Sequence, residues 1–337
     1  MTARLPLPIV GPLDRVRHSM LLRRTARVLP EILGAQAADW CFHGQLSGES
    51  GSATALIGPP DRAGALLKLS HTPQGRDHLA RQAKILQRLR ADERIGSWRE
   101  LLPQVIAASE VNRCYCTVET RLSGNDGRLV LKDPERRDKL ARTALATIAR
   151  LHRQTVTVRT VDSGAILRWV HLPVARVRGC VHRGERETLD EVERALAADL
   201  SGKDVAIGWL HGDYCADNVL VQDEEITGVI DWCQAEPEGL VILDVVGFLL
   251  NTERQVTGAE LGHVICSWLS GSPHPGHTMV ADAQEALHAD VLATRTLVLL
   301  SWLLHVSNNL TQSQRYAANP LWTHHNIHAV LRAITVS

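Results

Sequence analysis

Two aspartates and an asparagine stand close together in the stretch HGDYCADNVLV, His211–Val221. A second apolar segment, ITGVI, follows and ends at an Asp-Trp pair. Pairing of the apolar segments as a hairpin brings Asp213, Asn218 and Asp231 to one end, because the polar residues then fall at the strand tips. Carboxylate and carboxamide oxygens suit Mg²⁺, which prefers one or two carboxylates together with phosphate oxygens. The stretch therefore predicts a magnesium site at which the phosphates of a nucleotide complete the coordination.

The pattern HGDxxxxN followed by IDW resembles the catalytic loop and metal-binding segment of the aminoglycoside phosphotransferase and choline kinase family, over roughly residues 40–250. That family shares the protein-kinase-like fold. The resemblance implies that Asp213 orients the acceptor hydroxyl and accepts its proton. It implies that Asn218 and Asp231 hold Mg²⁺ against the β- and γ-phosphates of ATP or GTP. His211 would brace the loop, and Asp217 is either a solvent-facing loop residue or a third metal ligand.

Two residues outside the loop also match family positions. His152, in ARLHRQT, lies at the end of an expected helix and is interpreted as structural. Asp244, in GLVILDVVGFLL, matches an aspartate in the helix that follows the metal segment. We expect this buried carboxylate to hydrogen-bond the catalytic loop.

A lysine inside an apolar strand predicts a phosphate contact. Lys68, in ALLKLS, is costly to bury without an anionic partner, and it matches the family's phosphate-binding lysine. The alternative is an edge-strand lysine whose ammonium group reaches solvent. The earlier segment LSGESGS occupies the place of the family's nucleotide loop, where small residues let backbone N–H groups approach phosphate. The candidate residues of that loop are Ser47, Gly48, Ser50, Gly51 and Ser52.

One position departs from the family pattern. The helix after the lysine strand usually offers a glutamate to the lysine, and this chain has Gln82 there. An amide can accept a hydrogen bond from Lys68 without cancelling its charge. Either the register differs, or nucleotide positioning is altered, or catalysis is weakened. The segment VETRLSG resembles the hinge between lobes, where backbone groups of about Glu119 to Arg121 would meet the purine edge of either ATP or GTP.

The elements that must position these residues predict an α+β protein with two lobes. Residues 39–120 are expected to form a nucleotide-binding N-lobe, with an antiparallel meander, a helix over 76–90 and two further strands. Residues 121–337 are expected to form a mainly helical C-lobe for catalysis and acceptor binding. Residues 1–38 are expected to form an N-terminal helical extension, whose arginine-rich face is interpreted as solvated.

Composition excludes several classes of protein. The 37 basic and 37 acidic residues cancel, which leaves no field of the kind that gathers nucleic acid or an anionic membrane. Seven cysteines without a CxxC pair indicate reduced thiols. The prolines near the amino terminus interrupt any signal-peptide core, and the longest apolar stretches fall short of the roughly 20 residues that span a bilayer. A cytoplasmic protein is therefore expected.

The acceptor is open on sequence grounds. A hydroxyl of a small molecule, such as an aminoglycoside, another antibiotic, a sugar or an amino alcohol, is the leading hypothesis, and a Ser/Thr hydroxyl of a peptide is the second. Glu236, Glu238 and Glu253 could attract a cationic acceptor, although such a small acidic excess is ordinary. The oligomeric state is not indicated.

The carboxyl-terminal segment is rich in polar and aromatic residues and contains several histidines. It could line a polar acceptor pocket or cover the helical core, and the second interpretation is favoured. The histidines are not spaced as a metal set, because no acidic or thiolate ligand completes them. They are His305, His324, His325 and His328.

Two rival classes of function are weighed against the kinase. A nucleotide-binding pseudokinase that regulates or scaffolds a partner is favoured by Gln82. The intact Lys68, Asp213, Asn218 and Asp231 oppose it, because an inactive relative needs neither a base nor metal ligands. A metal-dependent hydrolase would explain the HGD sequence but not the glycine-serine loop or the lysine strand.

Overall fold

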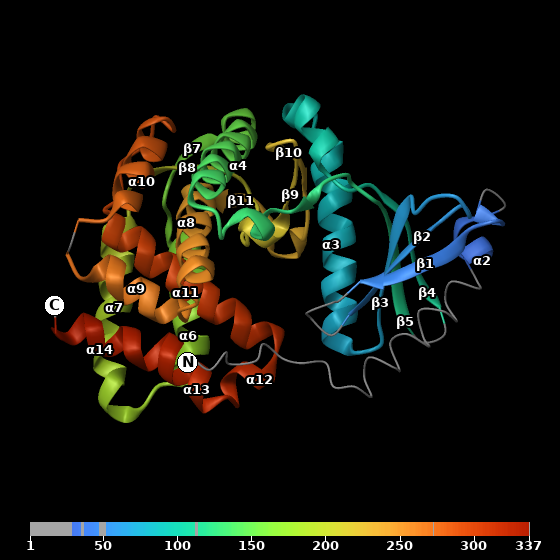
Figure 1. Ribbon diagram of the computed structural model, residues 1–337. Helices are drawn as coiled ribbons and strands as arrows, with labels where there is room; N and C mark the ends of the chain where they lie inside the picture. Colours follow the sequence, from blue (N-terminus) through green and yellow to red (C-terminus); the bar gives the residue numbers. More distant parts are fainter. Residues whose placement is uncertain (1–28, 35–36, 47–51, 112–113, 272, 337) are drawn as a thin grey trace. The chain divides into compact units, whose positions relative to one another are not determined.

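The structure is a computed structural model that describes residues 29–34, 37–46, 52–111, 114–271 and 273–336 (Figure 1). The chain packs as two compact units. Unit 1 contains the described residues up to Ser123 together with the short segment Gly228–Cys233. Unit 2 contains Gly124–Thr227 and the chain from Gln234 onward. The expected boundary after residue 120 stays a prediction, and most of the expected helical extension lies outside the described residues.

Unit 1 is built on a five-stranded sheet in the order β1-β2-β3-β5-β4, with every pair antiparallel. A long helix, α3, lies along this sheet (Figure 1). The strands are β1 (Cys41–Leu46), β2 (Ala53–Gly58), β3 (Ala65–Ser70), β4 (Val105–Val111) and β5 (Cys114–Thr120). The helices are α2 (Leu29–Leu33), α3 (Pro73–Ala91) and a 3₁₀ segment (Glu93–Leu101). The expected meander, helix and two further strands are confirmed.

Alternation of side chains places the lysine of β3 on the face that α3 covers. Ile57, Leu67 and Leu69 are fully buried in the apolar core on one face of the sheet. Lys68 points to the other face, where α3 packs against β3 and β5. The helix can start directly after β3 because the Thr72 hydroxyl accepts the N–H of Gly75 at 3.2 Å, with a proline in the first turn.

Unit 2 is mainly helical and carries two three-stranded sheets, in the orders β10-β9-β6 and β11-β8-β7. The strands are β6 (Asn125–Asp126), β7 (Thr157–Thr160), β8 (Asp204–Leu210), β9 (Val219–Gln222), β10 (Glu225–Val229) and β11 (Glu236–Leu240). The first helices are α4 (Pro134–Thr155), α5 (Ser163–Ile166), α6 (Leu172–Arg178), α7 (Arg186–Leu200) and α8 (Ile242–Thr257). The later ones are α9 (Leu261–Leu269), α10 (Pro275–Glu285), α11 (Thr294–Gln312), α12 (Gln314–Ala317), α13 (Pro320–Thr323) and α14 (Ala329–Val336).

The apolar stretches of the second half are buried helices, as expected. Val246 and Leu250 of α8 pack in the same apolar core as Leu300 and Trp302 of α11. Across the described ranges, none of the helices combines the length and the apolar character that a membrane crossing requires.

The hairpin predicted beside the catalytic loop is present. β9 and β10 are neighbours in their sheet and are joined by Asp223 and Glu224, with φ of 50° and 67°. Two consecutive left-handed residues are typical of the type I′ turn, whose twist matches that of paired strands. Asn218 directly precedes β9, and Asp231 follows β10 along the chain.

His305 on α11 is a histidine that stays neutral in the folded chain. Its Nε2 accepts a hydrogen bond from Asn309 Nδ2 at 2.8 Å. Burial lowers the pKa of His305 to about 4, and the Arg254 guanidinium acts in the same direction. An unfolded histidine titrates near ~6.5, so the folded chain binds this proton more weakly than the unfolded chain. The stabilising contribution is therefore complete above that pH and is lost as the pH falls toward 4.

When the pH is lowered from neutral to about 4, we expect the contribution of His305 to the free energy of unfolding to fall by on the order of 2–3 kcal/mol. In His305→Gln, which keeps an acceptor for Asn309, the loss on acidification should be smaller by that amount. Urea unfolding midpoints at the two pH values measure the difference, with the exposed His324→Gln as control. A His305 variant as acid-sensitive as the native chain would contradict this expectation.

Candidate active site

The loop after β8 is held by one buried carboxylate. Asp244 of α8 is 1% exposed and accepts the backbone N–H of His211 at 2.8 Å and that of Gly212 at 2.9 Å. His152 of α4 contacts the same carboxylate through Nε2 at 3.0 Å. The expectations that Asp244 hydrogen-bonds the loop and that His152 is structural are confirmed. Gly212 is required by its φ of +79° and because a Cβ would lie 2.6 Å from the Gln234 carbonyl oxygen.

Asp213 and Asn218 interact directly within this loop. The Asn218 amide donates to the Asp213 carbonyl oxygen at 2.8 Å and to Asp213 Oδ2 at 3.3 Å. The N–H of Asp213 donates to His211 Nδ1 at 3.3 Å, as expected for a bracing histidine. The Asp213 side chain is partly exposed, whereas Asn218 is buried. The Asn218 amide nitrogen is therefore committed to the loop, and its oxygen is the atom suited to face a cation.

Asp217 is tied to two neighbouring segments of unit 2. Arg128 Nε lies 3.3 Å from Asp217 Oδ1, and Gln255 of α8 donates to Oδ2 at 2.9 Å. The Asp217 side chain is 30% exposed, and its alternative role as a third metal ligand stays a prediction. These contacts fix the position of the turn that ends at Asn218.

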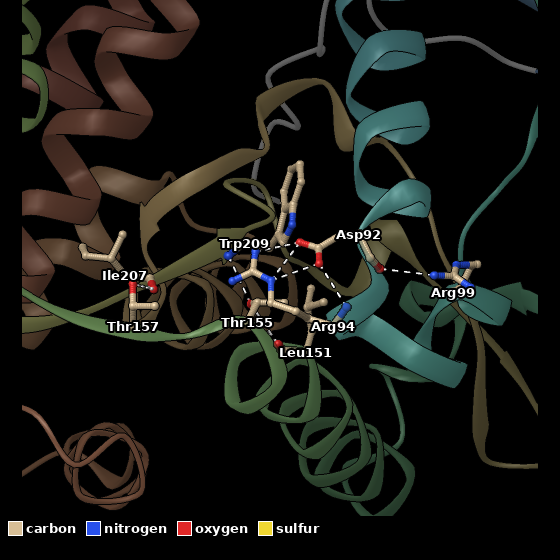
Figure 2. A network of polar contacts seen from close by, with 8 residues as sticks. All are labelled: Asp92, Arg94, Arg99, Leu151, Thr155, Thr157, Ile207 and Trp209. Atoms are coloured by element: carbon tan, nitrogen blue, oxygen red, sulfur yellow. Dashed lines mark hydrogen bonds and ion pairs between the residues drawn. The ribbon is translucent and has the colours of Figure 1, made fainter.

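A second set of contacts holds the strand that leads into the loop. The Thr155 hydroxyl, at the end of α4, donates to the Leu151 carbonyl oxygen at 3.0 Å and accepts the N–H of Trp209 at 3.2 Å (Figure 2). Thr157 donates to the carbonyl oxygen of Ile207 at 3.5 Å. Because Trp209 lies on β8, two residues before His211, the end of α4 and the start of the loop are fixed together.

Unit 1 has its own polar anchor after α3. Arg94 forms an ion pair with Asp92 at 2.7 Å, and Arg99 donates to the Asp92 carbonyl oxygen at 3.2 Å (Figure 2). These bonds stabilise the 3₁₀ segment that carries Trp98, a fully buried ring.

Lys68 has an anionic partner, but on a strand and not on α3. Its Nζ lies 2.9 Å from Glu119 Oε2, with the side chains 17% and 1% exposed. The Gln82 amide donates to the other oxygen, Oε1, at 2.8 Å. Burial lowers the pKa of Lys68, yet Glu119 and Asp231 outweigh it and raise the pKa above its ordinary value. The alternative of an edge-strand lysine that reaches solvent is therefore wrong. Gln82 does not accept a hydrogen bond from Lys68 as expected, but donates one to Glu119, the partner of the lysine.

The charges of Lys68, Glu119 and Gln82 predict the effect of placing the family's glutamate at position 82 of α3. Gln82→Glu places a second carboxylate beside Glu119 and removes a buried hydrogen bond, so we expect the free energy of unfolding to fall by about 1–3 kcal/mol. In Gln82→Glu with Glu119→Gln, one carboxylate and one amide are again present, and most of the loss should be recovered. Urea unfolding of the two variants measures this. The expectation would be wrong if Gln82→Glu were more stable than the native chain, or if the double variant did not recover the lost free energy of unfolding.

The segment that carries Asp231 is anchored in unit 1 by the next residue. Trp232 is fully buried and packs edge-to-face on Trp98, with ring centroids 5.6 Å apart. Its indole N–H donates to the Val229 carbonyl oxygen at 2.9 Å. Asp231 itself has a φ of 61°, in the left-handed region that costs a non-glycine residue energy. Such backbone strain is concentrated at functional sites.

The environment of Asp231 keeps its carboxylate ionised. Burial by itself raises the pKa of Asp231, but His78, Lys68 and Cys233 together hold it below its usual range. His78 Nε2 lies 3.6 Å from Asp231 Oδ1, an oxygen that makes no hydrogen bond to any residue within the described ranges. An ionised carboxylate with an unsatisfied oxygen fits a hard cation such as Mg²⁺. Sequence reasoning missed His78, because nothing in the helix pattern relates it to Asp231.

The expected nucleotide loop and hinge are described only in part. Ser47, Gly48, Ser50 and Gly51 lie outside the described residues, and Ser52 is half-buried before β2. At the hinge, the N–H of Arg121 donates to the Gly64 carbonyl oxygen at 3.1 Å, and that of Thr120 to Gln104 at 2.9 Å. These two N–H groups are therefore engaged within unit 1. Any purine contact of this segment is left to its other backbone groups, and it stays a prediction.

The fold is shared with solved phosphotransferase structures. A thermostable mutant of the aminoglycoside phosphotransferase APH(4)-Ia in ternary complex with AMP-PNP and hygromycin B is 15% identical, with a TM-score of 0.57 over 91% of this chain and 98% of that chain. The GDP complex of an aminoglycoside 2′-phosphotransferase-IIIa mutant is 14% identical, with a TM-score of 0.55 over 94% and 97% of the two chains. These likenesses show a kinase-like fold.

Comparison of the sequence with models of protein families identifies the family. No curated protein matches the chain by sequence. The model of the phosphotransferase enzyme family matches residues 45–293, a range that includes Lys68, Asp213, Asn218 and Asp231. The match covers well over half of the chain and agrees with the fold. The chain belongs to the phosphotransferase enzyme family, whose members are kinases that act on hydroxyl groups of small molecules.

Proposed function

We propose that this chain transfers the γ-phosphoryl group of ATP or GTP, with Mg²⁺, to a hydroxyl group of a small molecule. The observation that carries the proposal is the position of Asp213. Its carboxylate is partly exposed and contacts Asn218, and it lies in a loop whose backbone is fixed by Asp244. A carboxylate that is held in place and open to solvent can orient a hydroxyl and take its proton.

In the proposed reaction the acceptor oxygen forms a bond to the γ-phosphorus. The bond from that phosphorus to the β,γ-bridging oxygen breaks, and the nucleoside diphosphate leaves. The acceptor proton goes to the carboxylate of Asp213. Asn218 and His211 hold this carboxylate and its backbone in one orientation, which supplies the positioning on which phosphoryl transfer depends.

The nucleotide phosphates would be held from unit 1. Glu119 keeps Lys68 charged in a buried position, so its ammonium group can contact phosphate oxygens. Asp231 and Asn218 are the proposed ligands of Mg²⁺, supported by their oxygen donors and by the loop spacing. Bound Mg²⁺ neutralises charge on the β- and γ-phosphates. The sharing of one ion by Asp231 and Asn218 is supported by the family pattern.

The acidic residues beyond the metal segment argue against a strongly cationic acceptor. Glu253 accepts the indole N–H of Trp268 at 2.7 Å and contacts His274 at 3.0 Å. Glu238 pairs with Arg159 at 2.9 Å. Because these carboxylates already have partners, they offer little free negative charge to an acceptor. We therefore place a neutral or weakly charged hydroxyl compound ahead of a polycationic aminoglycoside.

The test is an acceptor screen with γ-labelled ATP and GTP in the presence of Mg²⁺. The panel contains sugars, amino alcohols, aminoglycosides and a Ser/Thr peptide, so that the small-molecule and peptide alternatives are separated. We expect acceptor-dependent release of nucleoside diphosphate and one added phosphoryl group on the product. Phosphorylation of the peptide alone would replace the small-molecule proposal.

The pseudokinase alternative loses its main support. Gln82 favoured it as a missing partner for Lys68, and Glu119 supplies that partner from β5. Tight nucleotide binding without turnover on any acceptor or on water would bring the pseudokinase back as the better description.

A further inference from the structure

A cluster of two histidines and a glutamate lies in unit 2, built by residues that the proposed function does not use. His328, at the end of a π-helical turn (His324–His328), contacts Glu185 Oε2 through Nδ1 at 2.6 Å. The ring of His182 stacks on that of His328, with centroids 4.2 Å apart and planes within 8°. One ligand atom from each of the three residues lies within 4.8 Å of the others.

Packing fixes the buried half of this cluster. In the π-helical turn, Asn326 accepts the N–H of Gly262 at 3.1 Å, and its carbonyl oxygen accepts the Trp302 indole N–H at 2.7 Å. A side chain at Gly262 would collide with the His325 carbonyl oxygen at 1.9 Å, so α9 approaches the turn closely. π-helical turns inside helices are frequent at functional sites. The turn therefore holds His328 in place, with only 6% of its surface exposed.

The other half comes from a distant part of the sequence. His182 and Glu185 directly precede α7, and α14 packs against α7 (Figure 1). Thr188 and Thr335 join the same two helices through their hydroxyls at 3.0 Å. Glu185 is mostly buried, while His182 is exposed and free to change rotamer. The acidic ligand that sequence spacing did not supply to His328 is thus supplied by the fold.

We propose that His182, Glu185 and His328 bind a divalent transition-metal ion of the zinc type. Two imidazoles and one carboxylate form a donor set that suits Zn²⁺ and its neighbours, whereas Mg²⁺ prefers oxygen ligands. The ion takes the place of the contact between His328 Nδ1 and Glu185, and the neutral imidazole then carries its proton on Nε2. His182 leaves the ring stack to direct a nitrogen at the ion, and water completes the coordination.

Such an ion joins the segment before α7 to the carboxyl-terminal helices. Because His328 is far along the sequence from His182 and Glu185, the three ligands meet only in the folded chain, and the ion therefore raises the stability of the fold. Arg183 and Arg186 are exposed neighbours of the ligands and weaken the attraction for a cation. We therefore expect micromolar and not structural-zinc affinity.

The test is a titration of the full chain with Co²⁺ followed by Zn²⁺, under excess Mg²⁺. We expect Co²⁺ to produce a visible ligand-field absorption with one equivalent bound and Zn²⁺ to remove it. His182→Gln and Glu185→Gln should each weaken binding at least tenfold. His263→Gln is the matched control, because His263 contacts His325 at 3.3 Å and, among the residues that the structure describes, no carboxylate completes a metal-binding set there.

One other donor group must be separated from this one. His78, Asp231 and Cys233 of unit 1 also have ligand atoms within 4.8 Å of one another. Asp231→Ala should therefore keep the absorption that His182→Gln removes. No absorption in the native chain, or absorption unchanged in His182→Gln, would overturn the proposal. Because His182 is exposed, its variant decides the matter even where Glu185→Gln fails to fold.

Discussion

Asp213→Asn is expected to lower kcat for phosphoryl transfer by roughly 10²–10⁴-fold, the usual contribution of a positioned general base. The amide cannot accept the acceptor proton, but it is close in shape to the carboxylate and keeps an oxygen near the Asn218 amide. Nucleotide affinity should change little, because the proposed phosphate and metal contacts are made by other residues. Steady-state kinetics with the best acceptor of the screen, together with nucleotide titration, measures both quantities.

Asp223→Asn is the matched control for this substitution. Asp223 is exposed in the turn between β9 and β10, and its φ of 50° is a conformation that asparagine tolerates. Its kcat should equal that of the native chain. An Asp213→Asn variant that retains more than a tenth of the native kcat would remove the general base from the proposed mechanism.

Asp244→Ala is expected to lower the free energy of unfolding by about 3–5 kcal/mol. The substitution leaves three donors without their acceptor: His152 Nε2 and the N–H groups of His211 and Gly212. His152 and His211 are buried in unit 2, where water does not readily replace the lost carboxylate, whereas Gly212 is exposed. The catalytic loop should also lose its fixed position, so kcat is expected to fall along with stability.

The measurement is urea unfolding, with Glu238→Ala as control. Glu238 pairs with Arg159 on the surface, and an exposed pair contributes ~0–1 kcal/mol. Asp244→Asn should lie between the two, because it keeps one acceptor oxygen. An Asp244→Ala variant no less stable than Glu238→Ala would show that the carboxylate does not hold the loop.

The candidate catalytic loop could be located in the sequence because its residues are close along the chain. The spacing from Asp213 to Asn218, and an Asp-Trp pair after the next strand, are local patterns. Asp244 could be found for a related reason, since a single carboxylate in an apolar helix must have polar partners. The partner of Lys68 could not be found in this way, because Glu119 is set beside it by the register in which β5 pairs with β3.

The remaining residues that sequence reasoning missed depend on packing between distant segments. His78 meets Asp231 only because Trp232 anchors its segment beside Trp98. Glu185 meets His328 only because α14 packs against α7. No periodicity or motif in a single sequence carries such information, since each contact joins residues whose spacing is set by the whole fold. Most of the nucleotide loop and the amino-terminal extension stay predictions.

The first measurement to make is calorimetric titration of the native chain, Asp231→Ala and Asp213→Asn with ATP and GTP, each with and without Mg²⁺. A phosphotransferase of the kind proposed should bind at least one nucleotide only with Mg²⁺. Binding should be lost in Asp231→Ala, which removes a proposed metal ligand, and kept in Asp213→Asn, which removes only the proposed base. A native chain that binds neither nucleotide, or an Asp231→Ala variant that binds as tightly as the native chain, would contradict the assignment of this site.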